Sequence, residues 1–349
     1  MRRASMACAV LMIVLAGCSE DDPVAPPAPP SGGLGTPLTG MGAIEAQSPL
    51  FWSFTADEIV AVASFNDPNS NSLIAVASTT GATRQLEPVA SSPLSLTPDG
   101  AGVYYVTLEL DSTVARSVEL MFNMTRRRLN RCDGGGCFHV VLPAPLAVDQ
   151  VAIYPVADST ALQNVSTGAR QMLTSGYPLA FSLDGTRLLK KEVNEPIQDA
   201  LIFDIGAGTS LPANLGLPDE IGDYLVRWTT TGIEVLYQTL DRKDLVLRRA
   251  GPGQDAIVFS TPDTLEVAMD WKDERIAVWT SKAAGAGRSY ELTVIHGSAS
   301  LVGVNRVATT TLTPGRPVLP PDGSDQIVYA VDRRLYRSTY TPPVEGAPR

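Results

Sequence analysis

The sequence predicts an all-β fold made of repeated four-stranded antiparallel sheets, and three observations predict it. A pattern of a short apolar strand, a tight turn and a second, β-branched or aromatic strand recurs seven times. Asp-Gly stands at the turn of the clearest copies, and Asp-Gly between such runs favours a hairpin. No helical periodicity separates the copies. Because one small sheet cannot bury both faces alone, we expect a closed ring, a seven-bladed β-propeller of four-stranded antiparallel blades; a β-sandwich or an open array is the alternative.

The copies of the repeat follow one another at 35 to 50 residues. The clearest are YPLAFSLDGTRLLK (177–190), SPLSLTPDGAGVYYV (92–106) and RPVLPPDGSDQIVYA (316–330). One apolar residue before each turn serves as a marker of the copy, and the seven markers are Phe54, Leu96, Leu146, Phe181, Trp228, Trp271 and Leu319. A second hairpin is predicted after most markers, at 73–86, 161–173, 245–259 and 290–304. Each unit therefore holds four short strands.

The last copy is too short to complete its own sheet. Only 30 residues follow Leu319, which is enough for about three strands in all, ending near 333–340. We expect the fourth strand to come from the other end of the chain, from residues 40–47, and to pair beside the C-terminal strand. This pairing would close the ring.

The hairpins FSLDGTRLL and LTPDGAGVYYV resemble the repeats of TolB-type propellers, a periplasmic class whose blades carry a Ser-x-Asp-Gly turn. The resemblance covers residues 48–340 and places the chain among WD-repeat-like propellers in the broad sense, although the Gly-His and Trp-Asp signatures of WD repeats are absent. TolB has six blades and a further N-terminal domain, whereas this chain has seven copies and no room for that domain. The biological role of TolB is therefore not carried over.

The first 17 residues have the three parts of a secretory signal: a basic start at Arg2 and Arg3, an apolar segment over 6–14, and small residues before Cys18. About ten apolar residues are too few to span a bilayer. The stretch LAGC (15–18) resembles the bacterial lipoprotein box, which implies that Cys18 is acylated and becomes the first residue of the mature chain. The alternative is a plain signal peptide cut nearby, with Cys18 an incidental thiol.

Three regions follow from this interpretation: a lipoprotein signal peptide (1–17), the lipidated cysteine with a flexible Pro/Gly linker (18–39), and the β-propeller (40–349). The linker is rich in proline and glycine and has almost nothing to bury. Ser19 is not the aspartate that retains proteobacterial lipoproteins at the inner membrane, so the resemblance implies an outer-membrane lipoprotein of the cell envelope. Acidic residues at 20–22 are compatible with surface exposure as well as with a periplasmic location.

Composition and motifs exclude several classes of function. The chain has 27 basic and 37 acidic residues, a formal charge of −10, so nucleic acid is not an expected partner. Its histidines are His139 and His296, and no nucleophile elbow, His-Glu-x-x-His pair or phosphate loop is present. We assign no catalytic residue, no metal site and no cofactor. We expect a monomer whose partners are the lipid bilayer, through acylated Cys18, and an envelope protein or polysaccharide.

The aspartates of the Asp-Gly turns, Asp99, Asp184 and Asp322, recur and are therefore tempting as functional residues. Capping of the turn by the aspartate explains the recurrence, since glycine takes the positive φ that such a turn needs. We therefore interpret these three residues as structural.

One stretch, residues 116–142, departs from the repeat. Four arginines fall within residues 126–131 of this stretch, in an otherwise acidic chain, and two cysteines stand around Asp-Gly-Gly-Gly. In an exported protein Cys132 and Cys137 are expected to form a disulfide across a hairpin tip; a redox pair, or a metal site with His139, is the alternative. The arginines are either the solvated face of an edge strand or a basic interaction patch, and they are Arg126, Arg127, Arg128 and Arg131.

The function expected from the sequence is that of a non-catalytic binding or scaffold module, held on a membrane and offering its loops to envelope proteins or glycans. The alternative is an extracytoplasmic enzyme of glycoside hydrolase or lyase type that uses carboxylates facing the central channel. Two or three acids together at the channel mouth, with raised pKa values, would favour the enzyme.

Overall fold

The fold was obtained from a computed structural model of the full chain. The residues that the structure describes are 33–38, 43–44, 49–53, 57–64, 71–88, 92–110, 114–122, 125–133, 140–147, 149–156, 159–173, 176–192, 194–249, 255–296 and 303–341.

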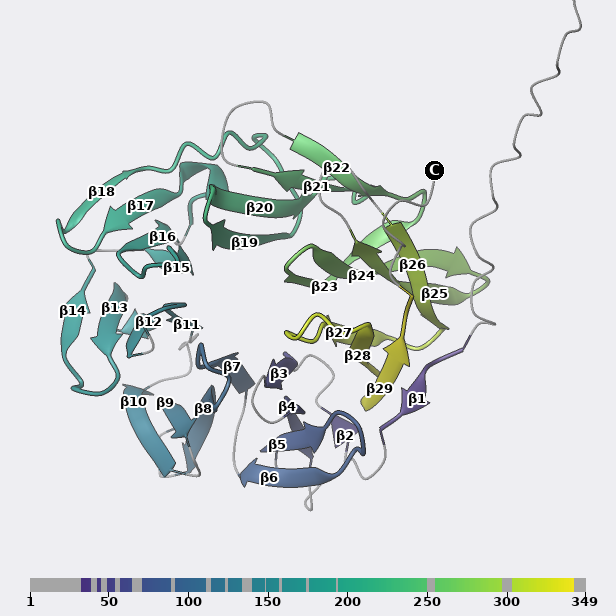
Figure 1. Ribbon diagram of the computed structural model, residues 1–349, viewed down its shortest axis with the longest axis horizontal. Helices are drawn as coiled ribbons and strands as arrows, with labels where there is room; N and C mark the ends of the chain where they lie inside the picture. The colour runs from purple at the N-terminus through teal and green to yellow at the C-terminus, as the bar shows by residue number, and fades with distance from the viewer. Residues whose placement is uncertain are drawn as a thin grey trace, which may run out of the picture.

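Within these residues the strands form seven sheets arranged as a ring about a central axis (Figure 1). Six of the sheets, blades 1 to 6, are each built from strands that are consecutive in sequence. The remaining sheet, the closing sheet, combines strands from both ends of the described chain. Every neighbouring pair of strands is antiparallel, as the repeated hairpins predict.

The strands of blades 1 to 3 cover the first part of the ring. Blade 1 holds β2 (Ala43–Ile44), β3 (Phe51–Ser53), β4 (Glu58–Ser64), β5 (Asn71–Ala77) and β6 (Thr83–Glu87). Blade 2 holds β7 (Ser92–Leu96), β8 (Gly102–Leu110), β9 (Val114–Phe122) and β10 (Thr125–Asp133). Blade 3 holds β11 (Val140–Pro143), β12 (Gln150–Val156), β13 (Ser159–Asn164) and β14 (Arg170–Met172).

Blades 4 to 6 and the closing sheet complete it. Blade 4 holds β15 (Tyr177–Phe181), β16 (Arg187–Lys191), β17 (Leu201–Asp204) and β18 (Thr209–Pro212), with a 3₁₀ turn at Ile197–Asp199. Blade 5 holds β19 (Tyr224–Thr229), β20 (Gly232–Gln238), β21 (Asp244–Arg248) and β22 (Asp255–Ser260). Blade 6 holds β23 (Thr264–Lys272), β24 (Arg275–Ala284), β25 (Gly287–His296) and β26 (Gly303–Thr310). The closing sheet holds β27 (Pro314–Val318), β28 (Gln326–Val331), β29 (Arg334–Thr339) and β1 (Thr36–Pro37).

The β-propeller of antiparallel sheets is confirmed, but the expectation of seven four-stranded blades is wrong as stated. Six blades are continuous in sequence, and the composite closing sheet completes the ring. Blade 1 has five strands, because β4 is long enough to pair with two short strands along the same edge. Strand β3 pairs with the first half of β4, where Phe51 lies opposite Val60. Strand β2 pairs with the last two residues of β4.

One marker of the repeat was placed too late in the sequence. The inner strand of blade 3 ends at Pro143, and Leu146 lies beyond it with 74% of its surface exposed. The turn of this blade lacks Asp-Gly, so the sequence offered no fixed point from which to count. Leu96, Phe181, Trp228 and Trp271 lie within the innermost strands of their blades, and Leu319 directly follows β27.

The middle strands of the sheets are buried on both faces. In β5, in β20 and in the first seven residues of β24 almost every residue is buried, where a half-exposed strand would show alternation. Neighbouring sheets cover both faces of each middle strand, and this explains continuous apolar runs such as IAVW in β24. The outer strands β14 and β18 are exposed throughout, as expected at the rim.

Side chains of one sheet also bind the backbone of the next. The accepting carbonyls lie in turns or at irregularities of the strand ladders, where backbone groups need such partners. These bonds run from Ser53 Oγ to Gly100 O (2.7 Å), Gln238 Nε2 to Glu266 O (2.8 Å), Trp279 Nε1 to Gly315 O (3.1 Å) and Arg337 to Ser78 O (2.8 Å).

The ring is closed by the N-terminal segment, but at a different place from the one expected. Strand β1 pairs with β29 through Thr36 and Arg337, whereas the predicted closing segment, 40–47, supplies β2, which pairs with blade 1. The amide of Ile44 also donates to Arg333 O (2.8 Å), so β2 joins blade 1 to the closing sheet. The chain therefore ties the two ends of the ring together twice.

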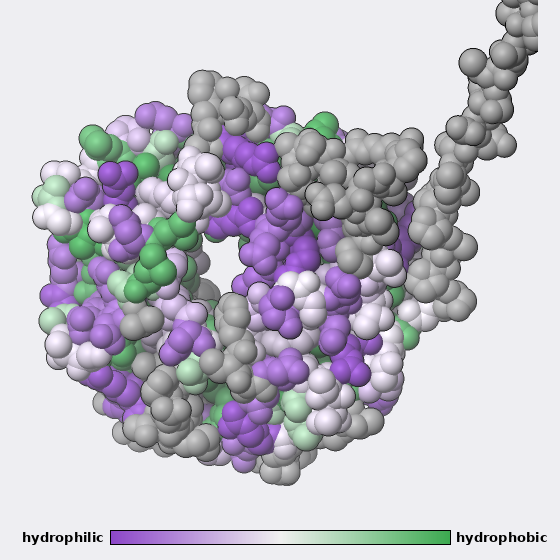
Figure 2. Space-filling model, viewed as in Figure 1, coloured by the Kyte–Doolittle hydropathy of each residue, from purple (hydrophilic) through white to green (hydrophobic). Residues whose placement is uncertain are grey.

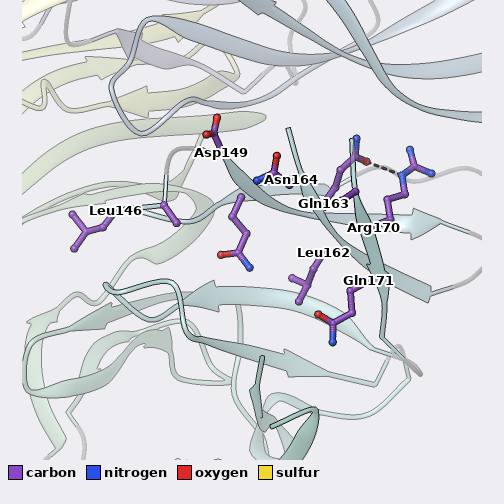
Figure 3. A pocket seen from close by; sticks show the side chains of 10 residues that line it. Leu146, Asp149, Leu162, Gln163, Asn164, Arg170 and Gln171 are labelled. Carbon is purple, nitrogen blue, oxygen red and sulfur yellow. Dashed lines mark hydrogen bonds between the residues drawn. The ribbon is translucent and has the colours of Figure 1, made fainter. Parts of the chain in front are cut away.

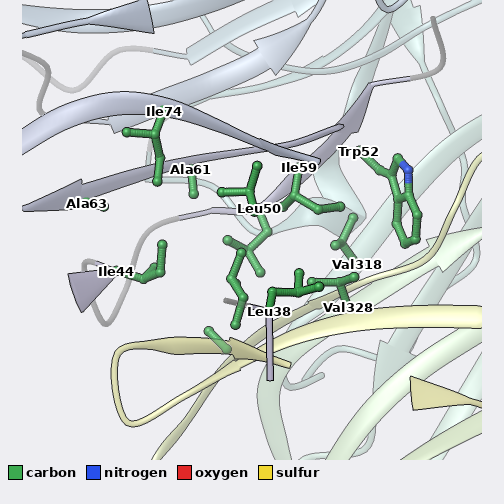
Figure 4. Close-up of a cluster of buried hydrophobic side chains, with 13 residues drawn as sticks. Leu38, Ile44, Leu50, Trp52, Ile59, Ala61, Ala63, Ile74, Val318 and Val328 are labelled. Carbon is green, nitrogen blue, oxygen red and sulfur yellow. The ribbon is translucent and has the colours of Figure 1, made fainter. Parts of the chain in front are cut away.

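A cluster of buried apolar side chains lies under this closure (Figure 4). It combines residues of the N-terminal segment, blade 1 and the closing sheet, including Leu38, Ile44, Leu50, Ile59 and Val328. Figure 4 shows Leu38 close to Leu50 and Val328, where the N-terminal segment crosses from one sheet to the other. Burial of these side chains stabilises the closed ring by about 1.5–3 kcal/mol for each fully buried aliphatic side chain.

Candidate functional site

The centre of the ring holds the candidate site. The innermost strands of the sheets are β3, β7, β11, β15, β19, β23 and β27, and the space-filling view shows an opening between them (Figures 1 and 2). Hydrophilic residues gather on the side of the opening where blade 6 lies, and apolar residues on the side of blade 4 (Figure 2). The wall of the channel is therefore chemically uneven.

A pocket of about 300 Å³ opens in this wall. Four sheets contribute to it, through β3, β7, β23 and β27 and the residues next to them. The lining residues are Leu50, Phe51, Trp52, Ser95, Leu96, Thr97, Pro98, Met269, Asp270, Lys272, Arg316, Pro317 and Val318. We call it the channel pocket. Because its lining comes from four sheets, it exists only in the closed ring.

Asp270 is the carboxylate of the channel pocket. Its Oδ2 accepts a hydrogen bond of 2.7 Å from the backbone N–H of Leu319, in the adjoining closing sheet. Burial raises the pKa of Asp270, while the positive charges of Lys272 and Arg316 and the hydrogen bonds from backbone N–H groups oppose this rise. The carboxylate is thus held in place by backbone, inside the ring, within electrostatic reach of two cations.

Those two cations, Lys272 and Arg316, are exposed at the surface of the channel. No ion pair within 4.0 Å joins either of them to a carboxylate among the described residues. Arg227, on the inner strand of blade 5, is different: it binds Glu234 at 2.7 Å and stacks over the ring of Trp271, 3.8 Å from the ring centre. Arg227 is fixed by the fold, whereas Lys272 and Arg316 keep their donors available.

The rest of the channel pocket is mostly apolar, and its polar side chains are already engaged. Ser95 Oγ donates to Val141 O (2.9 Å), and Thr97 Oγ1 donates to the carboxylate of Asp99 (2.6 Å). Trp52 Nε1 donates to Asp57 (3.0 Å). The free hydrogen-bonding groups of the pocket are therefore the charged ones.

The turn aspartates have the structural role that the sequence indicates. Thr97 and the amide of Ala101 donate to Asp99, and Ser182 (2.6 Å) with the amide of Thr186 (3.0 Å) donates to Asp184. These bonds lower the pKa of Asp184 to about 2. The glycines that follow Asp99, Asp184 and Asp322 have φ values of 68°, 72° and 78°. The aspartates accept turn N–H groups, and the glycines take the left-handed backbone.

The predicted basic patch lies on β10, the outer strand of blade 2. Arg126, Arg127 and Arg128 are exposed, and the side chain of Arg131 lies outside the described residues. Arg126 pairs with Glu87 of blade 1 (3.4 Å), and Arg127 donates to Ser166 O of blade 3 (3.2 Å). These two arginines therefore link blade 2 to its neighbours on both sides.

The predicted cysteines fall largely outside the described residues. This holds for Cys18, for Cys137 and for the side chain of Cys132, whose backbone ends β10. Since β10 and β11 belong to different blades, the segment between them connects two sheets and does not join two neighbouring strands of one hairpin. Acylation of Cys18 and the disulfide remain predictions.

A second pocket, of about 570 Å³, lies at blade 3 (Figure 3). It is lined by Leu146, Ala147, Asp149, Gln150, Leu162, Gln163, Asn164, Ala169, Arg170 and Gln171. Much of its hydrogen-bonding capacity is used within the blade: Arg170 Nε donates to Gln163 (2.9 Å), and the amide of Thr167 donates to Asn164 (2.7 Å). Its ionisable lining residues are Asp149 and Arg170, whose charges balance, whereas the channel pocket has an excess of positive charge.

Two features are absent from the described part of the chain. No group of three or more histidine, cysteine, aspartate or glutamate side chains is placed to hold a metal ion there. In the same residues no helix has the length and apolar character that crossing a membrane requires.

The sequence did not single out Asp270, Lys272 or Arg316. Asp270 and Lys272 directly flank the marker Trp271, so they are among the last residues of the inner strand β23. Which of these side chains face the channel depends on how the sheets are assembled into the ring. Aligning the seven copies would have shown charge at this point in blade 6, where blades 2 and 4 carry serine, threonine or alanine. Arg316 lies three residues before its own marker, Leu319, and the other copies have no charged residue at that position.

The comparisons with known proteins concern the fold. No family model matches the sequence, and no curated protein sequence matches it. The propeller domain of Cps50 (Swd1) from Myceliophteria thermophila has a TM-score of 0.59 at 12% identity and covers 87% of this chain and 99% of its own. Oligogalacturonate lyase from Vibrio parahaemolyticus has a TM-score of 0.58 at 10% identity, covering 87% and 92%.

TolB from Acinetobacter baumannii is also similar, with a TM-score of 0.41 at 17% identity over 78% of this chain and 60% of that one. That score is too low to support an argument about this chain. At identities of 10% and 12% the two better matches show that this chain shares their β-propeller fold, and they show nothing of its activity.

Proposed function

We propose that this protein is an extracytoplasmic lipoprotein, anchored at the outer membrane through acylated Cys18, whose β-propeller is a non-catalytic binding or scaffold module for envelope proteins or glycans. The signal-like N-terminus and the lipoprotein-box resemblance support the location. The Pro/Gly-rich residues between Cys18 and β1 would act as a tether that lets the ring reach partners away from the bilayer surface.

The channel pocket carries the proposal for binding. It combines an apolar wall, one carboxylate fixed by backbone and two cations with free donors, which is the composition of a recognition site. A binding site needs convergent polar groups on a rigid support, and four sheets supply that support here.

The alternative is an enzyme of glycoside hydrolase or lyase type. Its support is the presence of an oligogalacturonate lyase among the proteins of the same fold and the raised pKa of Asp270. Glycoside hydrolysis commonly uses two carboxylates about 5–9.5 Å apart, and the described lining of the channel pocket contains Asp270 without a second one. The arrangement therefore favours binding.

Affinity capture from the native envelope tests the binding function. A bulky residue at Ser95, in the variant Ser95→Trp, should fill the channel pocket and remove the captured partner. The control Ser210→Trp places the same side chain on the exposed strand β18 and should leave capture unchanged. Circular dichroism of both variants is the check that each of them folds. A partner retained equally by both variants would refute a role for the channel pocket.

An assay of oligogalacturonate cleavage, followed by the ultraviolet absorbance of the unsaturated product, tests the alternative. Turnover by the wild type that is lost in Asp270→Asn would favour the enzyme. We expect no turnover.

A further inference from the structure

The channel pocket has the opposite charge balance from the protein around it. The chain carries a formal charge of −10, yet the ionisable residues that line the pocket are Lys272, Arg316 and Asp270, two positive charges and one negative. The pocket is thus a positive site in an acidic protein.

The two cations also differ from neighbouring basic residues of blades 5 and 6 in being uncommitted. Arg248 is paired with Asp255 (2.9 Å), and Arg275 donates to Pro320 O (2.7 Å) and to Ser324 O (3.0 Å). Lys272 and Arg316 have no such partner among the described residues and face the channel pocket. A guanidinium and an ammonium that line one pocket with uncommitted donors can bind a carboxylate there through charge-assisted hydrogen bonds.

The rest of the lining limits what can be attached to that anion. The hydroxyls of Ser95 and Thr97 donate within the protein, and the indole N–H of Trp52 does so as well. A sugar with many hydroxyl groups would find few free partners, and each buried hydroxyl left without one is unfavourable. The side chains of Phe51, Leu96 and other lining residues instead offer apolar contact.

We infer that the channel pocket binds a carboxylate joined to an apolar group, with Lys272 and Arg316 on the carboxylate and the apolar wall around the rest. A pocket of about 300 Å³ is large enough for a small aromatic or aliphatic acid, or for the last residue of a polypeptide. This inference rests on the proposed binding function and names the ligand chemistry of the same site.

The test compares each acid with its neutral amide by isothermal titration calorimetry at low salt. The probes are 3-phenylpropionate and 3-phenylpropionamide, and the tripeptide Ala-Ala-Phe with a free or an amidated C-terminus. We expect the acid to bind about tenfold or more tightly than its amide, because a charge-assisted hydrogen bond is stronger than a neutral one. If Ala-Ala-Phe with a free C-terminus binds more tightly than 3-phenylpropionate, the ligand is a polypeptide C-terminus. If 3-phenylpropionate binds as tightly as the peptide or more tightly, the ligand is a small acid.

Variants separate the pocket from general charge. Lys272→Gln with Arg316→Gln should abolish the preference for the acid. The matched control Lys282→Gln with Arg334→Gln removes two exposed cations outside the pocket and should retain it. The inference is overturned if acid and amide bind equally, if no acid binds, or if the control pair loses the preference as fully as the pocket pair. In those cases envelope capture sensitive to Ser95→Trp would still support the binding function, whereas capture insensitive to Ser95→Trp would remove both.

Discussion

Blade 6 and the closing sheet show two ways of completing a propeller sheet. In blade 6 the strands β24 and β25 are ten residues each, consecutive in sequence, and pair along their whole length. In the closing sheet the outer strand is β1, two residues long, brought from the other end of the chain. Blade 6 is completed by its own consecutive strands and shares its core with the closing sheet, whereas the outer edge of the closing sheet depends on a few contacts of the N-terminal segment.

Those few contacts are specific. The amide of Gly35 donates to Tyr329 Oη (2.8 Å), and Tyr329 Oη also lies 3.0 Å from Ser338 Oγ. The backbone of Gly35 runs so close to β29 that a Cβ there would collide with Arg337 O and Ser338 Oγ. Substitutions in the two regions should therefore act through different causes.

The largest effect is expected in the core of blade 6. Trp279 is fully buried, stacks edge-on against Tyr329 and donates to Gly315 O. Trp279→Ala should lower the free energy of unfolding by about 3–5 kcal/mol in urea denaturation. The control Leu211→Ala, at a side chain 69% exposed, should change it by less than about 0.5 kcal/mol. If Trp279→Ala lowered the free energy of unfolding by less than Gly35→Ala, beside the closing strand β1, the comparison would be reversed.

The second prediction concerns the close approach of β1. Gly35→Ala should destabilise the protein by about 1–3 kcal/mol, because the added methyl group displaces β1 from β29. In Gly287→Ala the methyl group meets its nearest atom, Ala284 O, at 3.9 Å, so this control should be nearly neutral. Equal melting temperatures for the two variants would show that β1 contributes little to closure.

A smaller effect is expected from one hydroxyl. Tyr329→Phe leaves the amide of Gly35 without its acceptor and should lower the free energy of unfolding by about 1 kcal/mol. Hydrogen exchange of the Gly35 amide should become faster. Tyr336 stacks on Tyr329 without a hydrogen bond from its own hydroxyl among the described residues, so Tyr336→Phe is the matched control and should change neither quantity.

The smallest effect is a pH dependence at the channel. The folded pKa of Asp270 is raised above its ordinary value of 3.8, so the folded state binds the proton more tightly than the unfolded state. The contribution of Asp270 to the free energy of unfolding is fully present below pH 3.8, and it is lost as the pH rises through the folded pKa. Asp270→Asn should therefore be more stable than the wild type at pH 7, and the difference should shrink towards acidic pH.

Asp184 supplies a control of opposite sign. Its pKa is lowered to about 2, so its stabilising contribution is present above pH 3.8 and is lost as pH falls towards 2. Asp184→Asn should be less stable than the wild type at pH 7. If urea denaturation at pH 4 and pH 7 gave both variants the same sign, the electrostatic interpretation of Asp270 would be wrong.

Local signals in the sequence predicted the hairpins well. Asp99, Asp184 and Asp322 fix turns through their own side chains and the following glycine, so the strands on either side could be placed within a few residues. The closing strand was missed because Gly35 and Pro37 have the composition of a linker. Proline is tolerated on an outer strand, where its missing N–H costs no ladder bond, and glycine is required by the contact with Arg337, which only the folded ring creates.

The candidate site was harder to predict than the fold. Asp270 is one of 37 acidic residues, and its place beside the marker Trp271 is the one signal in the sequence that distinguishes it. Its burial comes from the closing sheet, through the amide of Leu319, and its relation to Arg316 comes from the packing of two sheets. Properties that arise between sheets are absent from any single copy of the repeat.

The origin of β1 also sets an order of events during biosynthesis. Gly35 and Tyr329, which bind each other, are 294 residues apart. Strand β1 leaves the ribosome early, and it stays unpaired until its partner β29, near the end of the chain, has been synthesised. Pairings of such long sequence separation form late, because the intervening chain must be ordered first. Nascent or prematurely terminated chains would thus expose the open edges of blade 1 and of the last hairpin, where chaperones would bind and where mispairing between copies would begin.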